Sequence, residues 1–455
     1  MNTTLEYYEI YPKVPPVGKT VTITIRPLGG HAAFDAKKGY EINILPIKEN
    51  LEPDEGAELF PYSNYDWLTP TLTTQSEPSA APVTPPEGQA CAAGCLTFSY
   101  CFKREQEYFI RLYKKSDVKR EKRVQFRVYA VDADLYERRP YRGDMHVHST
   151  WSDGRESPDI VMTTYRKAGF DFTGLTDHRK FAASLAAIEA YKDAAVDMCM
   201  CAGEEVHLPG NHVHIVNFAG DDSAQAYAEA DIDRFNAEVS ALAAAPDIPD
   251  GVNRFEYAAC MWICERIRRF GGLAIFPHPH WQSNVYHVSE DMTDALFASG
   301  AFDAFELLGG VDPWDNNTQA AYYNEARAKG LNIAVVGSSD SHGQINRDYF
   351  NWFKTVAFAK ELTPEGIKEA VRSGYSVAVE EYPGENARVH GPYRLVRFTL
   401  FLLSEYFPIH DEMCFEEGRQ MKAYALGEPS AAQILKMLSG RTARWLEKAY
   451  KGLEA

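Results

Sequence analysis

Residues 144–178 read DMHVHSTWSDGRESPDIVMTTYRKAGFDFTGLTDH, and this stretch decides the fold of the chain. A short apolar strand pattern begins and ends it, and the helical pattern of residues 158–170 lies between the two. A strand, a helix and a second strand in succession are typical of a βαβ unit. Because the same alternation continues to about residue 383, we predict an α/β barrel of parallel strands.

Histidines and carboxylates gather where these strands end. His146 and His148 are two residues apart, and alternate side chains of a strand point to one face, so both imidazoles can address one point. The same spacing recurs in HVH at 212–214 and in DSH at 340–342. Barrel enzymes build their active sites at the ends of their strands. Imidazole together with carboxylate is a ligand set for Zn, Mn or Fe.

The concentration of histidines in this region has a physical implication. Ten of the thirteen histidines lie between residues 146 and 342. One histidine by itself is more often a hydrogen-bonded, partly buried side chain. Several apolar strands that end in polar residues are costly to bury unless cations share those residues. The pattern therefore predicts a metal site.

Before residue 139 the pattern is different. Short β-branched and aromatic runs between Thr20 and Arg127 are separated by Gly, Pro and Asn, which is typical of antiparallel strands in a sandwich. Residues 70–94 are rich in Pro, Ser and Thr, and we expect a long loop there. We predict a β-sandwich-like domain at 1–138, a hydrolase barrel at 139–383, and a C-terminal extension at 384–455 that is first strand and then helix.

Composition narrows the classes of function. A formal net charge of −17 disfavours a nucleic-acid polymer as the substrate, because phosphate backbones are bound by clustered Lys and Arg. No run approaches the roughly 20 apolar residues of a membrane span. The N-terminal residues show neither a signal peptide nor a lipid anchor, so we expect a cytoplasmic protein. The eight cysteines are too sparse for a disulfide framework, and we expect free thiols.

Five motifs resemble, in order, those of the polymerase and histidinol phosphatase (PHP) superfamily: DMHVHSTWSDG, GLTDH, GEEV, HPH and GSSDSHG. The resemblance covers residues from about 139 to 383. It implies a distorted (β/α)7 TIM-like barrel that binds two or three divalent metal ions, Mn, Zn or Fe. It also implies a phosphoesterase that cleaves a small phosphorylated metabolite or nucleotide with a metal-activated hydroxide.

The resemblance assigns nine ligands to three metal positions. These are His146, His148, Glu205 and Asp340 at the first, Glu205 with His214 and His278 at the second, and Asp153, His178 and His342 at the third. Glu204, His212 and His280 remain alternatives to their neighbours in the sequence. Asp177 is expected to orient a ligand or to form hydrogen bonds in the core, and Glu306 to orient a ligand.

Catalytic and substrate-binding residues are less constrained by the sequence. We take Asp340 and His280 as the candidate catalytic residues, and His207 and His287 are alternatives to His280 as the general acid. Arginine and lysine next to strand ends can bind phosphate oxygens. The candidates for this role are Arg155, Arg179 and Lys180.

Two other functions remain open. Metal ions held in this way could hydrolyse an amide or a lactone, as related amidohydrolase barrels do. Alternatively, the β-rich domain could be a module that recognises a protein or a carbohydrate. That domain could equally support the barrel or form a homo-oligomer.

Overall fold

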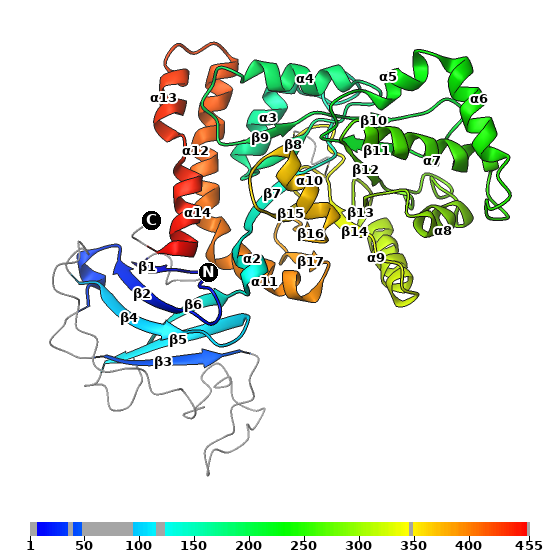
Figure 1. Cartoon of the computed structure of the whole chain (residues 1–455). Coiled ribbons are helices and arrows are strands. Elements are labelled where there is room, and N and C mark those ends of the chain that lie inside the picture. The colour runs from blue at the N-terminus through cyan, green and yellow to red at the C-terminus, as the bar shows by residue number, and fades with distance from the viewer. Residues whose placement is uncertain (1–6, 35–39, 48–93, 115–122, 345–348, 453–455) are drawn as a thin grey trace. The chain divides into compact units, whose positions relative to one another are not determined.

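The structure, a computed structural model, describes residues 7–34, 40–47, 94–114, 123–344 and 349–452. The long loop predicted at 70–94 lies outside the described residues, except for Gly94. Figure 1 shows the order of the elements along the chain.

The chain divides into two units by its internal contacts. Unit 1 consists of Met1–Glu137, Phe401–Tyr406 and Ala443–Ala455, and unit 2 of Arg138–Leu400 and Phe407–Thr442. The three functional domains proposed from the sequence, at 1–138, 139–383 and 384–455, stay a prediction.

Unit 1 contains two three-stranded antiparallel sheets, in the orders β1-β2-β4 and β3-β5-β6. The strands are β1 (Tyr8–Tyr11), β2 (Thr20–Pro27), β3 (Tyr40–Pro46), β4 (Leu96–Cys101), β5 (Gln106–Lys114) and β6 (Arg123–Ala130). Side chains from both sheets, such as Ile25 and Ile110, share one apolar cluster. The sandwich-like arrangement and its strands β2 to β6 were predicted from the sequence, whereas the short β1 was not.

Unit 2 contains a six-stranded sheet, in the order β17-β16-β15-β7-β8-β9, and a five-stranded sheet, in the order β10-β11-β12-β13-β14. The strands are β7 (Arg139–Asp144), β8 (Phe172–Gly174), β9 (Cys199–Cys201), β10 (Gly203–Val206), β11 (Ile215–Phe218), β12 (Leu273–Phe276), β13 (Ala304–Leu308), β14 (Ala334–Gly337), β15 (Phe353–Ala359), β16 (Ser376–Glu380) and β17 (Arg388–His390). The predicted α/β class is confirmed.

The expectation that all strands of this unit are parallel is wrong. β11 runs antiparallel to both β10 and β12, and β15 runs antiparallel to β7 and β16. Only residues 207–214 connect β10 to β11. A parallel pair needs a crossover of about a dozen residues or more, so this connection is too short for one.

The two sheets of unit 2 contact each other. Isolated parallel bridges pair Val147 with Ser341 and His178 with Glu205. One apolar cluster also takes side chains from both sheets, such as Phe172 of β8 and Ile275 of β12. The described strands thus form two bridged sheets rather than one closed barrel.

Helices cover the sheets of unit 2. They are α3 (Pro158–Lys167), α4 (Phe181–Ala190), α5 (Ala224–Glu229), α6 (Ile232–Ala243), α7 (Arg254–Arg269), α8 (Glu290–Ser299), α9 (Pro313–Ala328), α10 (Pro364–Arg372), α12 (Phe407–Ala425) and α13 (Ala431–Leu438). Two further helices, α11 (Tyr393–Glu405) and α14 (Arg441–Lys451), are divided between the units. Unit 1 contains α2 (Ala133–Tyr136) and the 3₁₀ turn η1 (Gly30–Ala32). Helices α7 and α9 pack against the five-stranded sheet (Figure 1). In the described part of the chain, no helix has the length and apolar character needed to cross a membrane.

Candidate metal centre

The candidate ligands come from the ends of strands in both sheets. His146 and His148 follow β7, and Asp340 follows β14. His214 precedes β11, and because this strand runs antiparallel to its neighbours, its first residue lies at the same edge as their last ones. Backbone hydrogen bonds join the sheets here, from Asp340 N–H to the His146 carbonyl (2.9 Å) and from His148 N–H to the Ser341 carbonyl (3.0 Å). The bridges between the sheets therefore position the ligands.

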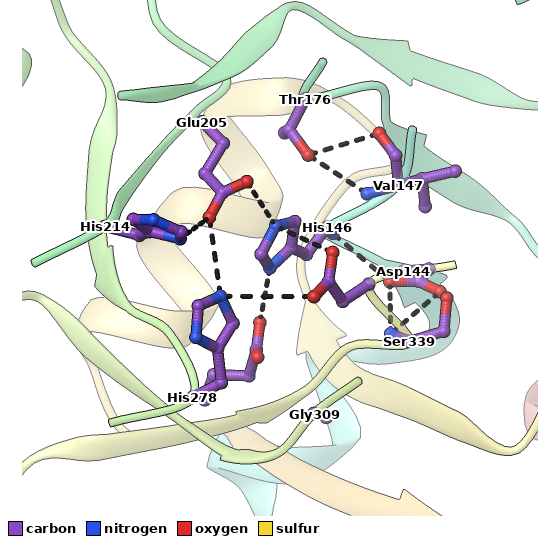
Figure 2. A network of polar contacts seen from close by, with 12 residues as sticks. Asp144, His146, Val147, Thr176, Glu205, His214, His278, Gly309 and Ser339 are labelled. Carbon is purple, nitrogen blue, oxygen red and sulfur yellow. Dashed lines mark hydrogen bonds and ion pairs between the residues drawn. The ribbon is translucent and has the colours of Figure 1, made fainter. Parts of the chain in front are cut away.

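Glu205 lies at the centre of the cluster and is fully buried. Figure 2 shows the side chains of His146, His214 and His278 turned toward it. Six ring nitrogens lie within 4 Å of its carboxylate oxygens: His178 Nδ1 at 2.6 Å, His214 Nδ1 at 2.7 Å, His146 Nε2 at 3.3 Å, His278 Nε2 at 3.4 Å, His207 Nε2 at 3.5 Å and His148 Nε2 at 3.6 Å. Burial alone would raise the pKa of Glu205, but the imidazoles of His146 and His214 hold it well below its usual value. The carboxylate is therefore charged at neutral pH.

The first group of possible ligands comprises His146, His148, Glu205 and Asp340. Asp340 Oδ1 lies 2.8 Å from His148 Nε2 and 3.3 Å from His146 Nε2. His146 Nε2, His148 Nε2, Glu205 Oε2 and Asp340 Oδ1 are buried and have no well-directed hydrogen bond to any described residue. Unsatisfied buried polar atoms are costly, so four of them at one point indicate a missing common partner.

Another group of possible ligands lies nearer to solvent and comprises His148 together with the three residues of the third metal position, Asp153, His178 and His342. Asp153 Oδ2 lies 3.3 Å from His342 Nε2 and 3.4 Å from His178 Nε2. The side chain of Asp153 is 55% exposed, whereas that of His148 is buried. This group therefore forms the accessible side of the cluster.

Two histidines that were not among the nine predicted ligands also belong to the cluster. His287 groups with His214 and His278, and His207 groups with His178 and Glu205. Burial, together with the neighbouring histidines, lowers the pKa of His214 to about 4 and that of His287 to about 3 despite the opposing charge of Glu205, so both rings are neutral near pH 7. Neither His207 nor His287 lies in a strand-end HxH pattern, which is why the sequence did not assign them as ligands.

The backbone is strained at two of the candidate ligands. His278 has a φ of 28° and Asp340 a φ of 49°, values in the left-handed region that side-chain-bearing residues rarely adopt. Such conformations persist only where the surroundings impose them, and they concentrate at functional sites. At Asp340 the backbone hydrogen bond to His146 is one such constraint.

Two buried carboxylates support the ligand-bearing loops. Asp177 accepts hydrogen bonds from the backbone N–H and the hydroxyl of both Ser149 and Ser152 (2.7–2.9 Å), which shapes the loop that carries Asp153. Its predicted role as a hydrogen-bonding residue of the core is confirmed. Asp144 accepts hydrogen bonds from the backbone N–H groups of Ser339 and His146, and burial raises its pKa to about 7. No sequence pattern distinguished Asp144, although it is the last residue of the strand before His146.

The three alternative ligands point elsewhere. Glu204 accepts hydrogen bonds from the Ser223 hydroxyl (2.7 Å) and the Gln225 backbone. His212 is 82% exposed and pairs with Glu256 at 2.7 Å. The His280 ring packs between those of Tyr286 and Tyr322 and belongs to none of the ligand groups. The role of His280 as general acid stays a prediction.

The three candidate phosphate-binding cations differ in their surroundings. The Arg155 N–H donates to the carbonyl of His342 (2.9 Å), so this residue lies beside a candidate ligand. Arg179 follows His178 and forms an ion pair with Glu229. Lys180 is exposed directly before α4. Phosphate binding by these residues stays a prediction.

Replacing Glu306 by glutamine is expected to weaken metal binding by about 10-fold or more. Glu306 Oε2 lies 2.9 Å from His146 Nδ1, which turns Nε2 of the same ring toward Glu205 and Asp340. Carboxylates behind ligating histidines raise their basicity, and their loss typically costs 10–100-fold in affinity. Competition with a chromophoric chelator measures the change. Glu204→Gln is the matched control, and equal affinities of the two variants would contradict this role of Glu306.

The sequence of the chain was compared with protein-family models and with known proteins. No protein-family model matches the chain. A stretch of 62 residues, 14% of the chain, is 34% identical to the DNA polymerase/3'-5' exonuclease PolX of Bacillus subtilis (strain 168). The match spans 11% of that protein's length.

Solved structures are also similar to this chain. A two-domain protein from Bacteroides vulgatus ATCC 8482, described as containing a PHP-like metal-dependent phosphoesterase, aligns with a TM-score of 0.38 and 18% identity over 53% of this chain and 65% of its own. The chain resembles PHP-like metal-dependent phosphoesterases. A protein from Bifidobacterium adolescentis ATCC 15703 described as a metal-dependent phosphoesterase aligns with a TM-score of 0.31 and 20% identity. An amidohydrolase from Chromobacterium violaceum aligns with a TM-score of 0.32 and 19% identity, and each of these two alignments covers 45% of this chain and 89% of the other.

Because every TM-score is below 0.5, the function proposed for this chain rests on the residues of its own site.

Proposed function

We propose that the chain is a metal-dependent phosphoesterase that hydrolyses a small phosphorylated metabolite or nucleotide. The observation that carries the proposal is the buried, charged Glu205 carboxylate, which faces six imidazoles. If these rings were all protonated they would repel one another. If they were neutral, His146 Nε2, His148 Nε2 and His214 Nδ1 would be buried without a well-directed hydrogen bond to a described residue. Shared divalent cations remove both difficulties.

The donor set fits such cations. Neutral imidazole and carboxylate groups suit Zn, Mn and Fe, and two or three ions are compatible with the overlapping groups described above. We propose the nine ligands implied by the motifs: His146, His148, Asp153, His178, Glu205, His214, His278, Asp340 and His342. When bound, the ions supply a hydroxide nucleophile near neutral pH and neutralise charge that develops on phosphoryl oxygens.

The residues of the chain determine how a substrate meets this site. Glu205, His146 and His278 form a buried floor, while the half-exposed Asp153 and the partly exposed His342 open to solvent, so we propose that the substrate approaches from their side. Phosphate oxygens would contact cations at this rim, with Arg155, Arg179 and Lys180 as the proposed residues.

Asp340 is the proposed catalytic carboxylate. Burial would raise its pKa, but His146 and His148 lower it well below the usual value. Asp340 therefore stays ionised at neutral pH and can accept a hydrogen bond from the attacking water.

We further propose that the two bridged sheets of unit 2 are an open, distorted form of the (β/α)7 barrel implied by the motifs. The support is the pair of parallel bridges and the apolar cluster to which both sheets contribute. The candidate ligands would then surround one end of this barrel.

An assay of the metal-stripped chain tests the proposed function. An aryl phosphate and an aryl ester of the same alcohol are offered with and without added Mn²⁺ or Zn²⁺, and metal content is measured in parallel. We expect hydrolysis of the phosphate alone, and only with metal. Metal-dependent cleavage of the ester alone would favour the amidohydrolase-like alternative. A chain that binds no divalent metal would contradict both.

A further inference from the structure

His287 is held beside two of the proposed ligands by a short turn of the chain. The turn follows His278, and an isolated antiparallel bridge pairs Gln282 with Tyr286. His287 N–H donates to the Trp281 carbonyl at 2.7 Å, and Val288 N–H donates to the Pro279 carbonyl at 3.1 Å. The backbone therefore fixes the position of the His287 ring.

The ring lies against the imidazoles of both neighbours. Its centroid is 4.3 Å from that of His214 and 5.6 Å from that of His278, and Trp281 packs against it at 5.3 Å. One potential ligand nitrogen from each of the three histidines lies within 4.8 Å of the other two. Two Zn–N bonds of about 2.0–2.1 Å hold their nitrogens at most about 4.2 Å apart, so small rotations of these side chains would let one metal ion bind all three.

Two of the nitrogens that meet here have no hydrogen-bond partner in the described part of the chain. His287 Nε2 and His214 Nδ1 are buried and form no well-directed hydrogen bond to a described residue. His214 Nδ1 lies 2.7 Å and His278 Nε2 3.4 Å from the same oxygen, Glu205 Oε1. Three imidazoles thus meet at one position, and Glu205 Oε1 lies beside two of them, although the motif pattern accounts for only two of these imidazoles.

We propose that His287 is a further protein ligand of the metal ion at the second position, together with His214, His278 and Glu205. This inference rests on the proposed function, because it requires that the cluster be a metal centre. It adds a ligand that the strand-end motifs do not contain.

The extra imidazole gives this position a metal preference of its own. The first group offers two imidazoles and two carboxylates, whereas the second position offers three imidazoles and one carboxylate. Imidazole-rich sites favour zinc, while carboxylate-rich sites suit manganese and magnesium. The second position therefore binds Zn²⁺ in preference to Mn²⁺, and His287 contributes to that selectivity.

Two substitutions test the proposal, each in the full-length chain. His287→Gln removes the imidazole, and His287→Phe keeps a ring to pack against His214 and Trp281 but has no nitrogen. Metal-stripped protein is titrated with Zn²⁺ and with Mn²⁺ against a chromophoric chelator, and the visible absorption of the Co²⁺-substituted protein is recorded. His212→Gln, at an exposed histidine paired with Glu256, is the control.

We expect both His287 variants to lose at least about 10-fold in Zn²⁺ affinity at one position, with a smaller loss for Mn²⁺ and a changed Co²⁺ spectrum. The control should match the unsubstituted chain. Circular dichroism of the metal-stripped proteins verifies the fold. Because His287→Phe keeps a packed ring, a loss of Zn²⁺ affinity in this variant comes from the missing nitrogen and not from lost packing.

Unchanged Zn²⁺ affinity and an unchanged Co²⁺ spectrum in both folded variants would overturn the proposal while leaving the metal centre intact. Absence of metal binding by the unsubstituted chain would instead overturn the proposed function as well.

Discussion

Replacing His146 by alanine is expected to lower metal-dependent hydrolysis of an aryl phosphate by at least about 100-fold in kcat/KM. Loss of a residue that only orients a ligand already costs 10–100-fold, and His146 is itself a proposed ligand. Its Nε2 lies 3.3 Å from both Glu205 Oε2 and Asp340 Oδ1, so its removal takes a nitrogen from the buried floor of the site. Initial rates with added Mn²⁺ and the metal content of the purified variant measure the effect.

Two controls separate lost chemistry from lost structure. His212→Ala removes a histidine that is 82% exposed and should leave the rate unchanged. Asp340→Asn keeps the side-chain volume and should reproduce the loss if His146→Ala does not fold. Thermal unfolding in the presence of a chelator compares the folds without metal. A folded His146→Ala variant that retains full phosphatase activity would contradict the proposed site.

The strand ends of the site could be predicted from the sequence because their signal is local. The i,i+2 spacing of His146 and His148, directly after an apolar run, is enough to place both side chains on one face. The structure brings these histidines together with Glu205 and Asp340, in one group of possible ligands. In unit 1, short β-branched and aromatic runs separated by Gly, Pro and Asn likewise predicted strands β2 to β6.

Other features depend on pairings between distant segments. The direction of β11 follows from the short connection before it, which the sequence pattern did not reveal as a hairpin. The turn after His278 brings His287 to the cluster, and the spacing of histidines in the sequence does not predict that turn. The packing of α12 on α3 also depends on a distant pairing, because the buried Glu417 of α12 contacts Arg166 of α3, and no sequence pattern indicated this partner.

Replacing Arg166 of α3 by alanine is expected to lower the free energy of unfolding by about 3–5 kcal/mol, the usual cost of removing one partner of a buried ion pair. Arg166 is fully buried, and its Nε and Nη2 lie 2.8 Å and 2.6 Å from Glu417 Oε2 on α12. Its Nη1 also donates to the Phe170 carbonyl (3.1 Å) and lies 3.3 Å from Asp171 Oδ1. Without the guanidinium, the buried Glu417 loses its ion pair with Arg166, whereas Asp171 keeps its pair with His410.

The measurement is urea unfolding of the metal-stripped chain at pH 7. Burial would raise the pKa of Asp171, but His410 and Arg166 lower it, so its stabilising contribution is present above its unfolded pKa of about 3.9 and is lost as the pH falls through the lower, folded value. At pH 7 the contribution is complete. Arg268→Ala, which breaks a partly exposed pair with Asp303, is the matched control, with an expected loss of at most about 1 kcal/mol.

A double variant tests whether the loss comes from the uncompensated charge. Arg166→Met combined with Glu417→Leu removes both ends of the ion pair and keeps apolar volume between α3 and α12, where the two helices pack. Buried ion pairs replaced in this way are often neutral or stabilising, so we expect the double variant to be more stable than Arg166→Ala. If it is no more stable, the free energy lost in Arg166→Ala comes from packing and from the contacts of Arg166 with Phe170 and Asp171. The charge of Glu417 would then contribute little to the attachment of α12.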